Sequence, residues 1–588
     1  MSLNVSDYLV SRMSQWGVKR IFGYPGDGID GVMGALARAK DKIEFVQARH
    51  EEMAAFMACG HAKYTGTVGT CLATSGPGAV HLLAGLYDAK ADRQPVVAIV
   101  GQAARSVMGG HYQQEIDLQS LFKDVAHHYI QTVTVPIQLR HVIDRAYRTA
   151  IALRTPTCII LPLDVQELDA EEPPREHGTL HSGLDYSQPR VVPEQKDLQR
   201  AAEVLNAGKR VAILIGAGAA GAAHEVLEIA DKLGAGIAKA LLGKPILPDS
   251  ITNVTGGIGL LGTAATHEMM TTCDTLLMVG STFPYAEFLP EEGTARGIQI
   301  DINPTMLGLR YPMEVNLVGD SADTLRALLP FVDRKQDRTW LDKIESSVEK
   351  WWATLERRAM KDAEPLNPQR VFWELSPLLP DQAMLACDTG SSVYWYSRDL
   401  KLRAGMLAAH SGSLASMGAA LPYAIAAKFA YPERVAIALV GDGAMQMNGI
   451  NELITISRYW RTWRDPRFIV LVMNNRDLNM VSWEQRVLQG DPRFPASQDL
   501  PDIPYAGIAE QLGFDTIVVD TPEALADTWR RAFDSRRPVL VEAIVDPNIP
   551  PLPPHITMSQ ARNYLMAILK GDPDAFQLVK ASINQLFA

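Results

Sequence analysis

The sequence predicts an α/β protein of three domains, each built on a parallel sheet, followed by a C-terminal helical tail. Short apolar segments alternate with helical patterns along most of the chain, as buried parallel strands do. Most of these segments end in Gly, Asp, Asn or Pro, at the edge where open α/β sheets bind ligands. Two polar, proline-bearing stretches, 169–195 and 333–369, interrupt the alternation and divide the 588 residues.

The expected domains cover 1–180, 190–335 and 365–550, and the tail covers 551–588. The first domain is expected to hold strands near 20–26, 69–78, 94–101 and 156–163. The second is expected to hold strands near 210–218, 274–281 and 297–304. The third is expected to hold strands near 384–390, 434–443, 468–475 and 538–545. The segment before the first strand reads as an amphipathic helix with Ser6 as its N-cap, not as an export signal.

The composition excludes several classes of protein. The net charge of −11 argues against a nucleic-acid partner, which needs a basic face. The five cysteines are scattered without a Cys-x-x-Cys pair, which fits a reducing cytosol and predicts neither zinc nor disulfides. No apolar run reaches the roughly 18 residues of a membrane span. A cytoplasmic location is therefore expected.

The segment 439–453, LVGDGAMQMNGINEL, carries the first sign of chemistry. Asp442 stands between Gly441 and Gly443 at the end of an expected strand, and Asn474 and Asn475 end another. Parallel strands that end in Asp and Asn suggest an oxygen-ligated cation holding a phosphate, with the glycines allowing close approach of the backbone. The plainer alternative is a turn followed by a helix cap.

Segments spread over the whole chain together resemble enzymes that use thiamine diphosphate. They are 49–66 (RHEEMAAFMACGHAKYTG), 74–101 (TSGPGAVHLLAGLYDAKADRQPVVAIVG), 283–288 (FPYAEF), 298–304 (IQIDINP), and GDGAMQMNGINEL with the MNN at 473–475. The chain is most similar to pyruvate oxidases and the quinone-linked pyruvate dehydrogenase, and next to acetohydroxyacid (acetolactate) synthases. The resemblance implies one domain for the cofactor's pyrimidine, a central FAD-type domain and one for the diphosphate.

This resemblance assigns a role to each cofactor contact. Glu51 would protonate the pyrimidine N1′. Its neighbour Glu52 is expected to interact favourably with the dipole of the helix that starts here. Mg²⁺ would be held by Asp442, Asn475 and the backbone carbonyl of Asp477. The diphosphate would be held by Gly390, Ser391, Ser392, Gly441, Gly443 and Ala444. The pyrimidine side would be lined by Pro25, Gly26, Ser75 and Gly76, and the bent cofactor supported by Ser416 and Met417. These residues come from both ends of the chain, and in the family the first domain of one subunit faces the third domain of another, so the resemblance implies a homodimer or homotetramer.

The residues on the substrate side match the family pattern less closely than the cofactor contacts do. Gln114 would donate to a small 2-oxo acid. Gln113 stands where the family has a Phe, so a pyruvate-like substrate is less firmly implied. His81 matches a histidine of the oxidase branch, but a lone helix histidine is more often structural.

For the middle domain, the resemblance implies FAD. The strand, glycine-rich turn and helix at 210–225 are a weak nucleotide signal by themselves, and the acidic residue expected for NAD is missing. The residues implied are Gly216, Gly218, Gly259, Gly262, Thr282, Phe283, Pro284, Asp301 and Asp320. The alternative is an empty, vestigial domain.

Three functions remain open. The first is oxidative decarboxylation of a small 2-oxo acid, with electrons passing through FAD to quinone or oxygen. The second is an acetolactate synthase-like carboligase with structural FAD, which Met480, Val481 and Trp483 favour because oxidases carry Phe at the position of Met480. The third is an inactive cofactor-binding partner protein.

The tail offers a possible membrane contact. Asp572 and Pro573 are expected to start its last helix. Its apolar stripe consists of Phe576, Val579, Ile583, Leu586 and Phe587. The resemblance implies peripheral contact with the inner face of the cell membrane, while packing on the same subunit is the alternative.

Overall fold

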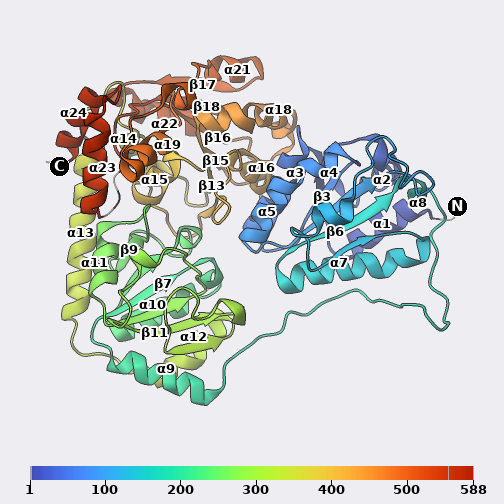
Figure 1. The fold of residues 1–588 in the computed structure, drawn as a ribbon, viewed down its shortest axis with the longest axis horizontal. Helices are drawn as coiled ribbons and strands as arrows, with labels where there is room; N and C mark the ends of the chain where they lie inside the picture. Colours follow the sequence, from blue (N-terminus) through green and yellow to red (C-terminus); the bar gives the residue numbers. More distant parts are fainter. Residues whose placement is uncertain (1–2, 552, 554, 587–588) are drawn as a thin grey trace.

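The computed structural model describes residues 3–551, 553 and 555–586 of the chain (Figure 1). It contains three six-stranded sheets, and neighbouring strands in each sheet run parallel. The N-terminal domain lies at the right of Figure 1, the middle domain at the lower left, and the C-terminal domain above the middle domain. The predicted fold class is confirmed.

The N-terminal sheet has the order β2-β1-β3-β4-β6-β5. Its strands are β1 (Arg20–Gly23), β2 (Glu44–Gln47), β3 (Gly69–Ala73), β4 (Val96–Gln102), β5 (Ile130–Thr132) and β6 (Pro156–Pro162). Its helices are α1 (Val5–Gln15), α2 (Asp30–Arg38), α3 (Glu51–Thr65), α4 (Pro77–His81), α5 (Leu83–Ala91), α6 (Leu118–Phe122), α7 (Leu139–Leu153) and α8 (Leu163–Gln166). Strands β3, β4 and β6 are buried along their whole length, which explains their continuous apolar runs.

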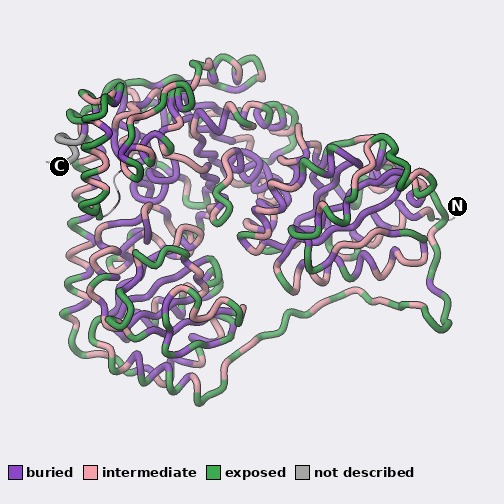
Figure 2. Tube along the Cα trace, viewed as in Figure 1, coloured by how far each residue is buried: buried purple, intermediate pink, exposed green. Residues whose placement is uncertain are grey.

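The middle sheet has the order β12-β11-β10-β7-β8-β9. Its strands are β7 (Val211–Ile215), β8 (Gly236–Lys239), β9 (Val254–Gly257), β10 (Thr275–Val279), β11 (Arg296–Asp301) and β12 (Val315–Val318). Its helices are α9 (Gln195–Ala207), α10 (Ala223–Leu233), α11 (Ala264–Thr272), α12 (Ser321–Leu328) and the long α13 (Thr339–Ala359). The segment between the first two domains has no regular structure and is mostly exposed (Figure 2).

The C-terminal sheet has the order β14-β13-β15-β16-β18-β17. Its strands are β13 (Met384–Cys387), β14 (Leu407–Ala409), β15 (Ala436–Gly441), β16 (Phe468–Asn474), β17 (Asp515–Val519) and β18 (Val539–Ile544). Its helices are α14 (Pro368–Leu375), α15 (Ser391–Arg398), α16 (Ala420–Ala430), α17 (Asp442–Ala444), α18 (Ile450–Tyr459), α19 (Asn479–Glu484), α20 (Pro495–Gln498), α21 (Tyr505–Gln511) and α22 (Leu525–Asp534). The tail forms α23 (Met558–Leu569) and α24 (Ala575–Leu586).

One hydrophobic core joins the first and last sheets. It contains Phe22 and Phe56 from the N-terminal domain together with Tyr423 and Val440 from the C-terminal domain. Helices α3 and α16 meet in this core, where the rings of Phe56 and Tyr423 pack edge to face at 6.0 Å. The two domains that carry the predicted thiamine diphosphate contacts therefore form one packed unit within the chain.

Two predicted helix starts are wrong. Helix α1 is capped by Asn4, whose side chain accepts the N–H of Asp7, while the buried Ser6 hydroxyl donates to the carbonyl of Gln166. Helix α24 begins at Ala575, two residues after Pro573. The carboxylate of Asp572 accepts the N–H of Asp574 at 3.0 Å, in the turn that leads into the helix, and also pairs with Arg486.

Candidate active site

Asp442 lies at the carboxyl end of β15, at the start of α17, and is 4% exposed. Its Oδ1 accepts the N–H of Gly443 at 2.8 Å, and its Oδ2 accepts the N–H groups of Asn475 at 2.9 Å and Arg476 at 2.6 Å. Burial raises the pKa of Asp442 to about 7, although these amides oppose the shift. The described hydrogen-bond donors to the Asp442 carboxylate are backbone amides, which carry no net charge. A divalent cation would supply the positive charge that this buried carboxylate needs.

The other expected metal ligands follow β16, the neighbouring strand. The side-chain oxygen of Asn475 accepts the N–H of Asp477 at 3.0 Å. The carboxylate of Asp477 accepts from the Ser482 hydroxyl at 2.7 Å and from the Asn479 amide at 3.2 Å. Because this carboxylate is committed to protein donors, only the backbone carbonyl of Asp477 suits the predicted metal contact. That carbonyl accepts the N–H of Asn479 at 2.6 Å, and a cation would compete for it.

Groups suited to binding a phosphate surround the turn that carries Asp442. The Ser392 hydroxyl is buried and has no hydrogen-bond partner among the described residues. It lies 3.8 Å from the place where a Cβ on Gly441 would stand. Gly390 has φ +119°, and helix α15 begins directly after it, at Ser391. Together with the N–H groups of α17, which runs to Ala444, this buried hydroxyl at a helix N-terminus fits a diphosphate oxygen.

Met417 lies against this turn. A Cβ on Gly443 would stand 3.2 Å from Cε of Met417. The N–H of Gly418 donates to the carboxylate of Asp388 at 2.9 Å, and the Ser416 hydroxyl donates to the Met417 carbonyl at 3.2 Å. Burial raises the pKa of Asp388 to about 7, against the effect of its backbone donors. The structure thus brings the predicted Met417 to the predicted diphosphate turn.

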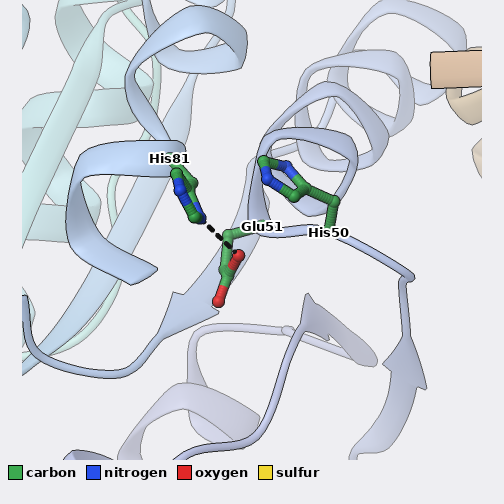
Figure 3. Close-up of side chains that lie close together, drawn as sticks. All are labelled: His50, Glu51 and His81. Carbon is green, nitrogen blue, oxygen red and sulfur yellow. Dashed lines mark hydrogen bonds and ion pairs between the residues drawn. The ribbon is translucent and has the colours of Figure 1, made fainter. Parts of the chain in front are cut away.

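Glu51 is the first residue of α3, and its side chain points toward His81 (Figure 3). Glu51 is 8% exposed. Its Oε2 lies 3.0 Å from Nδ1 of His81, which comes from α4. The following residues of α3, from Met53 to Phe56, are completely buried. A Cβ on Gly78 would stand 3.1 Å from the Glu51 Oε1, so the glycine is needed to leave room for the carboxylate. The expected acid therefore lies in a mostly apolar pocket with one polar partner.

His50 raises the question of a transition-metal site, because ligand atoms of His50, Glu51 and His81 all lie within 4.8 Å of one another (Figure 3). The Nδ1 of His50 accepts the N–H of Glu52 at 3.2 Å and so caps α3. In the neutral ring its Nε2 then carries the proton and is not a ligand. The Nδ1 of His81 faces Glu51. The cluster is better suited to orienting Glu51 than to holding a metal.

Gln114 lies beside the pyrimidine-side residues. It has φ +62°, and its side-chain oxygen accepts the Ser75 hydroxyl at 3.0 Å, which leaves its amide nitrogen to donate to a ligand. A Cβ on Gly76 would stand 2.8 Å from Cβ of Gln114, and one on Gly26 would stand 2.6 Å from Cβ of Thr74. Both glycines therefore permit close packing of three loops at the sheet edge. Two neighbours in these loops, Pro25 and Gln113, are exposed.

One polar contact joins the start of α3 to the segment that follows Asp442. The side-chain amide of Asn448 donates to Glu52 at 3.3 Å. Asn448 belongs to a π-helical turn, Met445–Gly449, which directly follows α17. The described hydrogen bond of the Glu51 side chain, in contrast, lies inside the N-terminal domain.

In the middle domain the predicted glycines pack tightly. Cβ atoms on Gly216 and Gly218 would stand 2.5 and 2.8 Å from atoms of Gly280, so these glycines let two turns at the sheet edge touch. A Cβ on Gly259 would stand 3.0 Å from the ring of Phe283. The flanking Thr282 is half-buried and Pro284 is exposed.

The two acidic residues predicted to contact FAD, Asp301 and Asp320, differ in burial. Asp301 is 4% exposed, and burial raises its pKa despite an N–H donor from Asn303 and a guanidinium of Arg93 at 3.7 Å. Asp320 is exposed and caps α12, with its carboxylate accepting the N–H of Asp323 at 3.1 Å. Asp301 is therefore the one placed to receive a buried ligand.

Helix α15 links the diphosphate cradle to the middle domain. The buried Arg398, at its last residue, donates from Nε to the carbonyl of Gly262 at 3.0 Å and also to the carbonyl of Leu260. The Ser397 hydroxyl donates to the carbonyl of Leu261 at 2.9 Å. Ser391 and Ser392 stand at the opposite end of this helix, so one rigid element touches both predicted cofactor regions.

The tail packs on the segment that follows the metal ligands. Asp572 and Asp574 both pair with Arg486 at 2.8 Å, and the rings of Trp483 and Tyr564 stack at 5.8 Å. Met480, in the same segment, is half-buried against the C-terminal core.

Only part of the predicted apolar stripe lies among the described side chains. Phe576 is 79% exposed and Val579 is 43% exposed. The side chains of Ile583, Leu586 and Phe587 lie outside the described residues. Within the described part of the chain, no helix combines the length and apolar character that crossing a bilayer requires.

Three residues of the site were missed by sequence reasoning. Asp388 stands at the end of β13 as Asp442 does at the end of β15, and that parallel could have identified it. Arg398 and Asn448 carry no sequence signal, because each acts on a partner that is distant in the chain.

Comparison with family models and known proteins shows what the chain is similar to. Three family models match: the N-terminal thiamine pyrophosphate (TPP) binding domain of thiamine pyrophosphate enzymes over residues 3–121, their central domain over 198–328, and their C-terminal TPP binding domain over 388–543. The chain is 37% identical to a putative thiamine pyrophosphate-containing protein, YdaP, of Bacillus subtilis, with 98% of both chains covered.

Two further relatives carry named activities. The chain is 30% identical to a pyruvate oxidase of Lactiplantibacillus plantarum, covering 91% of this chain and 88% of that one. It is also 30% identical to the acetolactate synthase isozyme 3 large subunit of Escherichia coli, covering 92% and 95%. With all three domains matched and these relatives aligned along nearly its whole length, the chain belongs to the thiamine pyrophosphate enzyme family.

Proposed function

We propose that this enzyme binds thiamine diphosphate, Mg²⁺ and FAD and oxidatively decarboxylates a small 2-oxo acid such as pyruvate. The observation that carries the thiamine chemistry is the pair of buried carboxylates, Glu51 and Asp442, in their different settings. Among the residues that the structure describes, Asp442 has no cationic partner, and it suits a metal. Glu51, in contrast, lies in an apolar pocket and suits a proton shared with a ligand nitrogen. Relatives named pyruvate oxidase and acetolactate synthase frame the choice of reaction.

Thiamine diphosphate, when bound, would supply the carbanion chemistry that releases CO₂ from a 2-oxo acid. Glu51 would hold a proton on the pyrimidine N1′, which activates the neighbouring amino group as a base. His81, 3.0 Å away, would orient the Glu51 carboxylate. Asp442, Asn475 and the Asp477 carbonyl would hold Mg²⁺, which anchors the diphosphate.

The substrate would lie beside Gln114. The side-chain oxygen of Gln114 accepts the Ser75 hydroxyl. The side-chain amide nitrogen of Gln114 would therefore donate to the 2-oxo or carboxylate oxygen of the substrate. Gln113 is exposed and polar, so the chain by itself offers no aromatic wall at that position.

FAD, when bound, would accept an electron pair from the decarboxylated substrate and pass it to quinone or oxygen. The middle domain supports this through the buried Asp301 and through the close approach of the Gly259–Gly262 turn to Phe283. A purified protein with a flavin absorption spectrum, lost on denaturation and identified as FAD, would support this assignment. A colourless protein that retains no added FAD would refute it.

Carboligation is the second candidate, and Met480 favours it. This residue, with Val481 and Trp483, follows the synthase pattern beside the metal ligands. Anaerobic mixing with pyruvate separates the two reactions. Bleaching of the flavin supports oxidation, whereas a flavin that stays oxidised while acetolactate accumulates supports the synthase. Release of CO₂ from pyruvate excludes the inactive-partner alternative, which the retained Glu51 and Asp442 already oppose.

The protein is proposed to work as a homodimer or homotetramer, in which Glu51 of one chain completes the metal site of another. The described hydrogen bond of Glu51 stays within its own domain, and the His81 side chain beside it is 41% exposed. Co-refolding Glu51→Gln with Asp442→Asn subunits tests this. A shared site would restore about a quarter of wild-type activity, since half the dimers are mixed and each has one intact site. An inactive mixture would show that each chain builds its own site.

A further inference from the structure

The loop 410–418, between β14 and α16, carries Ser416 and Met417. Ala415, directly before them, is exposed and has φ +55°. Residues other than glycine rarely adopt this left-handed conformation, and they keep it only where surrounding contacts impose it. Something therefore holds the loop in a conformation that its own sequence disfavours.

Two buried carboxylates of the N-terminal domain hold it. Asp92 accepts the N–H of Gly412 at 2.9 Å on one oxygen and the N–H of Ser413 at 2.8 Å on the other. Asp88 accepts the hydroxyl of Ser411 at 2.6 Å, and that same hydroxyl accepts the N–H of Ser416 at 2.8 Å. The chain of contacts thus runs from a buried acid in α5 to the residue before Met417.

Lys63 in α3 joins the two acids. Its ammonium lies 2.7 Å from Asp92 and 3.2 Å from Asp88, and it also donates to the carbonyl of His410 at 2.7 Å and to the hydroxyl of Tyr423 at 2.9 Å. Burial by itself would lower the pKa of Lys63, but the two carboxylates outweigh it and hold that pKa above its ordinary value. The cluster is charged and internally paired, so it is not waiting for a ligand of its own.

We propose that Asp88 and Asp92, joined by Lys63, are positioning residues that keep the loop 410–418 in its strained conformation and so hold Met417 against the Gly443 turn before the cofactor binds. The inference rests on the proposed binding of thiamine diphosphate at that turn. Such preorganisation raises affinity, because a ligand binds more weakly when only a fraction of the protein is in the competent conformation.

The test compares thiamine diphosphate affinity between the wild type and a set of variants, measured by calorimetry with Mg²⁺ on cofactor-stripped full-length protein. Asp92→Asn removes the charge that accepts two loop amides, and we expect about tenfold weaker binding. Ser411→Ala removes the hydroxyl that links Asp88 to Ser416, and it alters the core less than Asp92→Asn does. We expect weaker binding of thiamine diphosphate in this variant too. Ala415→Gly alone, which relieves the strain, should stay within about threefold of wild type.

Adding Ala415→Gly to Asp92→Asn is the decisive variant. If Asp92 acts by holding a strained loop, the added glycine should recover part of the lost affinity, because the loop then needs less restraint. The matched control is Asp185→Gly, which places glycine at another left-handed residue, φ +79°, in the exposed linker far from the loop. In the Asp92→Asn background it should recover nothing. Urea unfolding of each variant reports global stability separately.

The outcomes separate clearly. Wild-type affinity in both Asp92→Asn and Ser411→Ala would overturn the inference, as would equal recovery by the two glycines. Should Asp92→Asn not fold, Ser411→Ala and its combination with Ala415→Gly decide the same question. If the wild-type protein itself does not bind thiamine diphosphate, the proposed function fails, whereas binding by the wild type with unaffected variants overturns only this inference.

Discussion

Replacing Glu51 with Gln tests the proposed acid most directly. The two side chains have nearly the same volume, so packing in the apolar pocket and the neighbourhood of His81 should persist. What is lost is the carboxylate that would share a proton with the pyrimidine. Because Glu51 is only 8% exposed, water has little access to take over this role.

The expected loss follows from the kind of catalysis. A positioned acid or base contributes about 10²–10⁴-fold, and each factor of ten is about 1.4 kcal/mol of activation free energy. Glu51→Gln should therefore raise the barrier to loss of the cofactor's C2 proton by about 3–5 kcal/mol. The measurement is exchange of that proton with deuterium, stopped by acid and followed by NMR.

The neighbouring Glu52 provides the control. Its side chain is 20% exposed and accepts from Asn448, so Glu52→Gln removes a similar charge one residue further along the helix. It should change the exchange rate by less than about threefold. Exchange in Glu51→Gln within about twofold of wild type would refute the assignment. Equal slowing in both variants would show that the effect belongs to the charge of the helix end.

Four further predictions follow from particular contacts. Asp442→Asn should abolish Mg²⁺-dependent retention of thiamine diphosphate, seen by fluorescence titration; unchanged affinity would contradict the ligand role. Arg398→Met should weaken FAD binding at least about tenfold, by equilibrium dialysis, because two turn carbonyls lose a charged donor. Burial lowers the pKa of His410 from 6.5 to about 4, so the unfolded chain binds more protons between these values. The free energy of unfolding should therefore fall by up to about 3 kcal/mol because of this residue as the pH falls from 6.5 to 4. His410→Phe should remove this part of the pH dependence, measured by urea titration at each pH. Identical pH profiles for the variant and the wild type would contradict the prediction. Deleting 572–588 should abolish liposome flotation if the tail reaches lipid, and equal flotation with and without it would end that idea.

The sequence alone determined the inner strands of the first and last sheets and all inner strands of the middle sheet except β8. All eleven strands expected from apolar runs are present, because a strand buried on both faces must be apolar along its length. The seven strands it missed are β2, β5, β8, β9, β12, β14 and β17, and six of these are sheet edges. Edge strands are short and partly exposed; β17, for example, alternates buried and exposed residues. Their pairing is decided by the neighbouring strand rather than by their own composition.

The same division holds for the site. Asp442 and the pair Asn474 and Asn475 could be predicted from the sequence because they end central strands, and neighbouring parallel strands place their ends together. The choice of Asn475 within the pair came through the family resemblance. Glu51 and Met417 could be named only through the family resemblance. Tertiary structure alone decided what surrounds them. Asp88 and Ser411 are 323 residues apart in the chain, yet they form one 2.6 Å hydrogen bond in the core between two domains. No local pattern encodes such a contact, because a buried charge is stable only beside the partners that folding brings to it.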